Sequence, residues 1–272
     1  MTNEQEPGSP GRESNYGICH LSIVPVRLEP AEHAELGTQL LFGDVFVIEE
    51  TSPDKKWIRI TITSDNYSGW IDTKQFRRIS RQYYDLILTY ESPLSKGLIG
   101  LLQSDKRFIP ILMGSNLPFY KNGTVTLEGE VLTYQGEIIY AKRTNDPKHL
   151  EAVAHYYLGA PYLWGGKGHF GIDCSGFVQQ TFKFCGYNLP RDAWQQAECG
   201  IDVPFSGSRG GDMAFFSDDA GKISHVGIIT QSGQIIHASG EVRIDHFDAK
   251  GILNLEKRVY SHRLVSIKRL FN

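Results

Sequence analysis

The sequence predicts an α+β protein in which a β-rich N-terminal half precedes a C-terminal half of helices followed by strands. Between residues 20 and 79, short β-like runs such as LSIVPVRL, KWIRITI and SGWIDTKQF alternate with turn signals such as SPDKK, a spacing typical of a small barrel. Residues 81–140 continue in a looser form of this pattern, from YYDLILTY to EIIYAK, which predicts further strands. The N-terminal half is therefore expected to hold one or two small all-β modules.

The C-terminal half begins after RTNDP, a polar break with a proline. Apolar residues then recur with a helical period in 149–159, 174–186 and 191–200, and each of these segments ends in glycine. Five strand-like runs follow, namely GDMAFFS, ISHVGIITQ, QIIHASG, EVRIDHF and HRLVSIKRLF. We therefore expect four segments: a disordered tail (1–15), a first β module (16–80), a second β module (81–145) and an α+β domain (146–272).

Composition excludes several classes of function. The 272 residues carry a formal charge of −3 without a marked Lys/Arg cluster, so we expect no nucleic-acid partner. No apolar run is long enough to span a membrane, and the N-terminal segment lacks the apolar region of a secretory signal. We therefore expect a cytoplasmic monomer, with the cell envelope as the alternative if a precursor segment is missing. The four cysteines form no CxxC pair, so neither a metal nor another cofactor is expected.

The stretch GIDCSGFVQQTF places Cys174 where a helix should begin, directly after the candidate N-cap Asp173. Free backbone N–H groups and the helix dipole at this position favour a thiolate, as a cysteine nucleophile requires. The alternative is a buried sulfur that only packs, which is the commoner role of a free cysteine.

A thiol nucleophile needs a base, and His225 and His237 both lie in apolar strand settings on either side of QSGQ. Each taken alone reads as a core histidine. A two-residue loop centred on 232–233 would place them on opposite faces of the sheet. A three-residue loop, 231–233 with Gly233 left-handed, sets His225 opposite Ser239 and places both histidines on one face. The catalytic interpretation therefore predicts an odd loop or a bulge.

These segments together resemble the NlpC/P60 family of papain-like cysteine peptidases. PYLWGGKGHFGIDCSGFVQQTF, GDMAFFS, ISHVGIIT and IIHAS carry the resemblance, over about the last 125 residues. The preceding KWIRIT…YSGWIDT looks like the bacterial SH3 (SH3b) module that accompanies such domains. The resemblance implies a papain-like catalytic domain preceded by one or two small all-β SH3b barrels.

The resemblance also implies residue roles. Cys174 would be the nucleophile, His225 its base and His237 the residue that orients the base. Tyr162 would lie near the oxyanion site, with the Cys174 backbone N–H as the other donor.

The whole arrangement is similar to the γ-D-glutamyl-L-diamino acid endopeptidases of this family, which recycle cell-wall peptides with a free N-terminal L-alanine. The substrate would be a peptidoglycan-derived L-Ala-γ-D-Glu-diamino acid peptide, and Asp173 would bind its ammonium group as well as cap the helix. The other residues expected to contact this peptide are Ser175, Trp164, Tyr67, Glu35 and, for the D-glutamyl carboxylate, Arg191.

Two alternatives stay open at this stage. The chain could be a non-catalytic wall-binding scaffold that acts through its SH3b modules, or an amidase or acyltransferase on lipid-like substrates. Diaminopimelate and lysine are equally compatible with the position after the scissile bond. The remaining cysteines and histidines are expected only to pack or to face solvent: Cys19, Cys185, Cys199, His20, His33, His149, His155, His169, His246 and His262.

Overall fold

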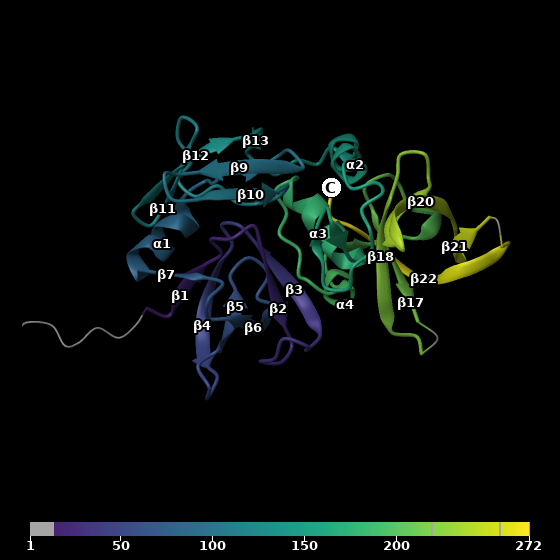
Figure 1. The fold of residues 1–272 in the computed structure, drawn as a ribbon. Coiled ribbons are helices and arrows are strands. Elements are labelled where there is room, and N and C mark those ends of the chain that lie inside the picture. The colour runs from purple at the N-terminus through teal and green to yellow at the C-terminus, as the bar shows by residue number, and fades with distance from the viewer. Residues whose placement is uncertain (1–13, 219, 256, 272) are drawn as a thin grey trace, which may run out of the picture.

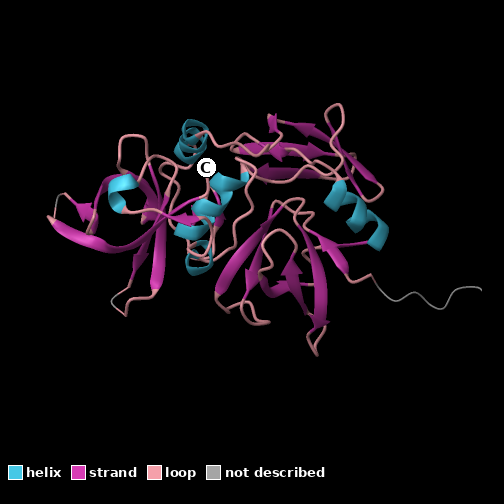
Figure 2. Ribbon diagram, turned by 180° about the vertical axis from the view of Figure 1, so that it is seen from behind, coloured by secondary structure: helices cyan, strands magenta, loops and turns pink. Residues whose placement is uncertain are grey.

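The computed structural model describes residues 14–218, 220–255 and 257–271. Most of the predicted tail, 1–15, lies outside these residues. Figures 1 and 2 show an N-terminal β-barrel, a second β-rich region beside it, and a C-terminal region in which helices pack on a sheet. The predicted α+β class is confirmed. In the described part of the chain, no helix is both long enough and apolar enough to cross a membrane.

The first module is one sheet of seven strands in the order β3-β2-β6-β5-β4-β1-β7. Alternate side chains point inward, as in β2, where Val24 and Val26 are buried between more exposed neighbours. The strands are β1 (Tyr16–Ile18), β2 (Ile23–Arg27), β3 (Leu36–Leu41), β4 (Val45–Thr51), β5 (Trp57–Ile62), β6 (Ser68–Asp72) and β7 (Arg77–Ile79).

The second region begins with a helix where the sequence predicts a strand. Helix α1 (Arg81–Thr89) covers most of YYDLILTY, and the strand prediction there is wrong. Ser80 caps the helix by accepting a hydrogen bond from the Tyr83 N–H at 3.1 Å, and Tyr84 and Ile87 share its buried face. An unbroken apolar run does not by itself distinguish a strand from a helix with a narrow buried stripe.

Strands complete this region, and they pack with α1 in a core that also includes Ile18, Phe42 and Ile79 of the first module. Four of them form a sheet in the order β10-β9-β12-β11, while β13 pairs with β8. The strands are β8 (Leu94–Ser95), β9 (Ile99–Gln103), β10 (Phe108–Leu112), β11 (Thr124–Leu127), β12 (Glu130–Gln135) and β13 (Ile138–Ile139).

The C-terminal region has the predicted order of helices and then strands. All three predicted helices form, as α2 (Pro147–His155), α3 (Cys174–Lys183) and the short α4 (Ala193–Gln196). The sheet runs β16-β22-β17-β18-β19-β20-β21, and a further pairing of β21 with β22 joins it back on itself. Its strands are β16 (Ile201–Asp202), β17 (Met213–Ser217), β18 (Ile223–Ile229), β19 (Ile235–Ser239), β20 (Glu241–Asp248), β21 (Gly251–Asn254) and β22 (Val259–Arg269), with the pair β14 (Lys167–Gly168) and β15 (Gly171–Ile172) and the 3-10 turn Phe205–Gly207 outside it.

Helix α3 lies between the C-terminal sheet and the N-terminal barrel (Figure 1). One face packs on β18 and β19 through Phe177, Val178 and Phe182, which are fully buried. The other face meets the first module through buried polar contacts: the Gln179 side-chain amide donates to Asp65 at 2.9 Å, and Lys183 lies 3.8 Å from Asp44. These contacts hold the middle and the end of α3 against the first module.

Candidate active site

The nucleophile candidate Cys174 is the first residue of α3, as predicted. The Asp173 carboxylate caps the helix by accepting the Gly176 N–H at 2.7 Å. Cys174 is 5% exposed and packs in the core beneath the sheet. Its thiol points to the Ser224 carbonyl oxygen at 4.0 Å, so it lies against the strand that carries His225.

The thiol is held in its neutral form, contrary to the expectation from its place at a helix start. Burial raises the pKa of Cys174 to about 12, and the negative charge of Asp173 adds to the rise. The partial positive charge at the helix N-terminus favours a thiolate. The cost of removing the thiolate from water is larger, so the neutral thiol is the stable form. In the free protein Cys174 is therefore a neutral thiol, and it must lose its proton as it reacts.

The hairpin between the two histidines has the odd loop that the catalytic interpretation predicts. The Thr230 N–H donates to the Gln234 carbonyl at 2.8 Å, which leaves 231–233 as a three-residue loop, and Gly233 is left-handed at φ +76°. Gly227 pairs with His237, a register that sets His225 opposite Ser239. This prediction is confirmed, and both imidazoles lie on one face of the sheet.

The two imidazoles form a direct hydrogen bond. His225 Nε2 and His237 Nδ1 are 2.7 Å apart, and both residues are buried. Burial holds the pKa of His225 well below its usual value, so the ring is neutral. With Nε2 engaged by His237, Nδ1 is the nitrogen left to accept the thiol proton. The structure does not contain a hydrogen bond between Cys174 and His225, and forming one requires a rotation of the thiol away from Ser224.

A third histidine packs on the base. The ring of His262, on β22, stacks on that of His225 with centroids 4.2 Å apart and an interplanar angle of 27°. Burial lowers the pKa of His262 to about 4. This histidine was expected only to pack or to face solvent. It reaches the base because β17 pairs both with β18, which carries His225, and with β22, which carries His262.

Tyr162 lies beside the nucleophile. Burial, followed by the charges that Cys174 and Asp173 would carry, raises the pKa of its phenol. The side chain therefore stays protonated and can donate a hydrogen bond, as an oxyanion-site residue must. Its backbone N–H is fixed by the Gly240 carbonyl at 2.8 Å, which ties it to the end of the histidine hairpin.

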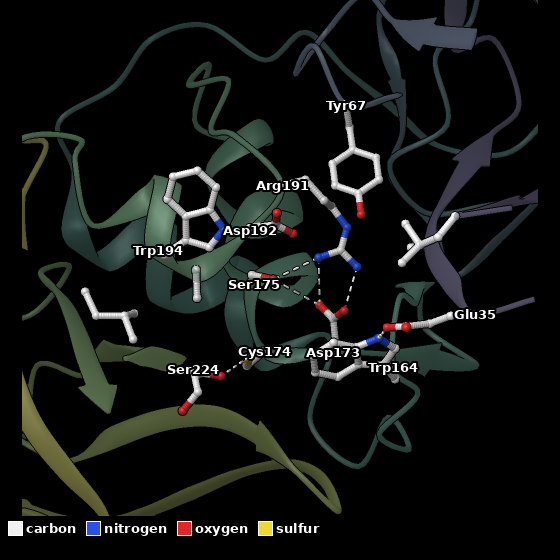
Figure 3. Close-up of a pocket in the computed structure, with 14 residues that line it drawn as sticks. Glu35, Tyr67, Trp164, Asp173, Cys174, Ser175, Arg191, Asp192, Trp194 and Ser224 are labelled. Atoms are coloured by element: carbon white, nitrogen blue, oxygen red, sulfur yellow. Dashed lines mark hydrogen bonds and ion pairs between the residues drawn. The ribbon is translucent and has the colours of Figure 1, made fainter. Parts of the chain in front are cut away.

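Cys174 opens into a pocket of about 290 Å³ that two modules build together (Figure 3). All six residues predicted to bind substrate line it. The lining consists of Leu28, Glu35, Gly37, Tyr67, Trp164, Asp173, Cys174, Ser175, Arg191, Asp192, Ala193, Trp194, Ile223 and Ser224. This volume is near the lower end of the range for small-molecule sites, about 300–1,000 Å³, and suits a short peptide fragment.

Arg191 is directed at the protein and not at a ligand. It is 1% exposed, and its guanidinium donates to both Asp173 oxygens, at 3.0 and 2.6 Å, and to the Ser175 hydroxyl at 2.8 Å. The remaining donors go to Thr38 and the Gly166 carbonyl. Because a guanidinium has five N–H donors, none is left for a D-glutamyl carboxylate, and that expected contact is wrong.

The same ion pair changes the expected role of Asp173. One carboxylate oxygen receives Gly176 and Arg191, and the other receives the Gly165 N–H at 2.8 Å and Arg191 again. Both oxygens thus hold the pocket floor in place, and the charge of Asp173 is neutralised by its partner. An ammonium group would need a carboxylate less occupied than this one.

Two further acids stand at the pocket. Glu35, from the first module, accepts the Trp164 indole N–H at 2.7 Å, so the two modules join at the rim. Gly165 makes this junction possible, because it has φ +76° and a side chain there would meet the Leu36 carbonyl oxygen at 2.3 Å. Asp192, half-buried, faces the pocket beside Arg191 (Figure 3). Asp192 was not among the residues expected to bind substrate, because nothing in the chain around it singles out its carboxylate.

The described residues contain no group of three or more His, Cys, Asp or Glu side chains placed to hold a metal ion. All four cysteines are free, and Cys19 and Cys185 are buried. Among the described residues, the reactive groups that meet at this site are therefore one thiol, a row of imidazoles and a set of carboxylates.

Comparison with known proteins agrees with this site. Residues 159–269 match the NlpC/P60 family, and residues 26–76 match the bacterial dipeptidyl-peptidase SH3 domain. The C-terminal domain is an NlpC/P60 cysteine peptidase domain. An NlpC/P60 peptidase acts on a peptide, and in this one the SH3 domain supplies Glu35 and Tyr67 to the pocket of the catalytic domain.

Relatives share both parts of this NlpC/P60 peptidase. It is 28% identical over 249 residues to a γ-D-glutamyl-L-lysine dipeptidyl-peptidase of Bacillus subtilis, covering 86% of this chain and 81% of the relative. It is 25% identical over 232 residues to a protein of the same name from Bacillus cereus, covering 75% and 67%. The crystal structure of an NlpC/P60 family protein from Bacillus cereus shares the fold, with a TM-score of 0.80 at 19% identity over 94% of this chain and all of that one.

Proposed function

We propose that this NlpC/P60 peptidase hydrolyses the bond between γ-D-glutamate and an L-diamino acid in peptidoglycan-derived peptides that have a free N-terminal L-alanine. The observation that carries the proposal is the charge of the pocket. Three carboxylates line the pocket, those of Glu35, Asp173 and Asp192, but only one guanidinium, that of Arg191, so the lining has an excess of negative charge for an ammonium group. Two relatives are named for γ-D-glutamyl-L-lysine cleavage.

In this proposal the ammonium group binds between Asp192 and Glu35. Asp173 is neutralised by Arg191, whereas Glu35 accepts a single described hydrogen bond from the neutral Trp164 indole. Burial raises the pKa of Asp192, so its carboxylate gains from a cationic partner. The acyl group that reaches Cys174 is then the L-Ala-γ-D-Glu unit, so the substrate's first two residues are released together.

The chemistry follows from the neutral thiol and imidazole. Cys174 Sγ bonds to the carbonyl carbon of the γ-glutamyl amide while its proton passes to His225 Nδ1. The oxyanion accepts hydrogen bonds from the Cys174 backbone N–H and the Tyr162 hydroxyl. The C–N bond then breaks as His225 returns the proton to the leaving amine, which leaves a thioester. Water, deprotonated by His225, hydrolyses the thioester and restores the thiol.

A product analysis tests this function. The enzyme is incubated with L-Ala-γ-D-Glu linked to diaminopimelate or to lysine, and the products are identified by mass spectrometry. We expect release of L-Ala-γ-D-Glu and the free diamino acid, and no release by Cys174→Ala. Binding of wall fragments by the wild type without cleavage of either peptide would support a scaffold acting through its SH3 module instead.

A further inference from the structure

A carboxylate lies beyond the two imidazoles, on the side away from the nucleophile. His237 Nε2 is 2.9 Å from Asp245 Oδ2. Asp245 is on β20, where Arg243 pairs with His237 and Asp245 with Ile235, so it is the diagonal neighbour of His237 on the same face. His225, His237 and Asp245 thus form a diagonal row over three adjacent strands, with contacts of 2.7 and 2.9 Å.

This row determines which ring nitrogens carry protons. An ionised carboxylate only accepts hydrogen bonds, so His237 must present Nε2–H to Asp245. Neutral His237 then has a lone pair on Nδ1, which accepts Nε2–H from His225. The proton of neutral His225 is therefore on Nε2, and its lone pair is on Nδ1. That nitrogen is the one available to Cys174.

The carboxylate itself is held in place. The Arg243 guanidinium donates to Asp245 Oδ1 at 2.7 Å, which leaves Oδ2 for His237. The hydrogen bond from His237, with help from Arg243, keeps the pKa of Asp245 below its usual value. Asp245 is thus ionised at neutral pH, where His225 is neutral as well, and these two states together give the proton arrangement described.

We propose that Asp245 is a positioning residue that fixes the tautomers of His237 and His225 and so keeps the His225 Nδ1 lone pair available to the thiol. The inference rests on the proposed role of His225 as base. Asp245 does not line the pocket and does not touch the nucleophile. Its effect is expected on the rate of acylation and not on substrate binding.

Substitution of Asp245 separates this role from a structural one. In Asp245→Asn the side chain keeps its size, but its oxygen is drawn to Arg243 and its amide NH₂ then faces His237 Nε2. That amide forces the proton of His237 to Nδ1, and the proton of His225 moves from Nε2 to Nδ1, where it blocks the base. Asp245→Ala removes the bias without imposing the wrong tautomer, and Asp245→Glu keeps a carboxylate.

The order of kcat distinguishes the two accounts. We expect wild type, Asp245→Glu, Asp245→Ala and Asp245→Asn in falling order, with Asn down by on the order of 1,000-fold and KM within about two-fold of wild type. The double variant Arg243→Met/Asp245→Asn should recover activity, because the Asn oxygen is then free to face His237. If the role of Asp245 were purely structural, the isosteric Asp245→Asn would have the kcat closest to that of the wild type. That result would overturn the proposal.

A second readout does not depend on catalysis. Nitrogen-15 NMR of the histidine rings should show Nε2–H tautomers for His225 and His237 in the wild type, and Nδ1–H tautomers in Asp245→Asn. Unchanged tautomers in that variant would overturn the proposal even if no substrate is cleaved. The matched control is Asp248→Asn, on the same strand, whose carboxylate accepts from Tyr260 at 2.6 Å and not from a histidine. It should leave both tautomers and kcat as in the wild type.

Discussion

Asp173 and Arg191 form a two-point ion pair beside the nucleophile, with N–O distances of 3.0 and 2.6 Å and both side chains buried (Figure 3). The pair joins the cap of α3 to the segment before α4. Through Thr38, the same guanidinium also reaches the first module. The position of Cys174 is therefore fixed by contacts among the cap of α3, the segment before α4 and the first module.

Breaking this pair should destabilise the protein strongly. Arg191→Met removes all five donors and leaves Asp173 buried without a cation, a change that costs about 3–5 kcal/mol in comparable cases. Urea denaturation measures the free energy of unfolding, and adding Asp173→Asn to the variant should recover part of the loss. The matched control is Arg81→Met, which breaks the exposed Arg81–Asp85 pair. An equal effect of both Arg variants would contradict the structural role of the buried pair.

Cys174 should react slowly with iodoacetamide at neutral pH. Its pKa is raised to about 12, so the thiolate that alkylation requires is scarce at pH 7. The rate, followed by mass spectrometry in a Cys199→Ser background, should rise with pH through 9. A fast rate that stays constant from pH 5 to 8 would indicate a resting thiolate–imidazolium pair and would disprove the neutral ground state.

The length of the 231–233 loop should decide activity. Deleting Ser232 leaves a two-residue loop, which shifts the register by one and turns His237 to the opposite face. We expect loss of peptidase activity below detection, with a circular dichroism spectrum close to that of the wild type. Gly233→Ala is the control: it strains a left-handed residue at a cost of about 1–2 kcal/mol but keeps the loop length and hence the activity. Activity in the deletion variant would show that the pairing of the two histidines is dispensable.

Acidification should destabilise the folded protein between pH 6.5 and 4. Burial lowers the pKa of His20 and of His262 to about 4, and that of His225 well below 6.5. In this window the unfolded chain binds protons that the folded protein does not, so the free energy of unfolding falls as pH falls. His20→Gln should make the fall smaller, whereas His33→Gln, at an exposed site, should not. A free energy of unfolding that holds constant from pH 7 to 5 would contradict these burial effects.

The sequence predicted correctly the features that depend on residues adjacent in the chain. The N-cap before Cys174 and the turn residues of QSGQ involve neighbours in the chain, and both predictions hold. It misled at α1, where an apolar run fits either a strand or a helix. It also assigned Arg191 to the substrate, because sequence carries no information on which carboxylate a buried guanidinium will meet.

The rest of the site arises from long-range pairing. Asp245 reaches His237 through the register of β19 and β20, and His262 reaches His225 through strands that meet only in the folded sheet. Asp192 and Glu35 line one pocket because the C-terminal domain docks on the first module. No spacing along the chain indicates these contacts, since each depends on how separate elements pack.

The central claim is that the pocket selects a free α-amine, and the ratio of kcat/KM for L-Ala-γ-D-Glu-diamino acid to that for its N-acetylated form tests it most directly. Removing the ammonium leaves carboxylates unpaired in the pocket, so we predict a ratio of at least about 100 in the wild type, equivalent to about 2.8 kcal/mol. In Asp192→Asn and in Glu35→Gln the ratio should fall by about 10-fold or more, mainly through the free-amine peptide. A ratio near 1 in the wild type would contradict the account.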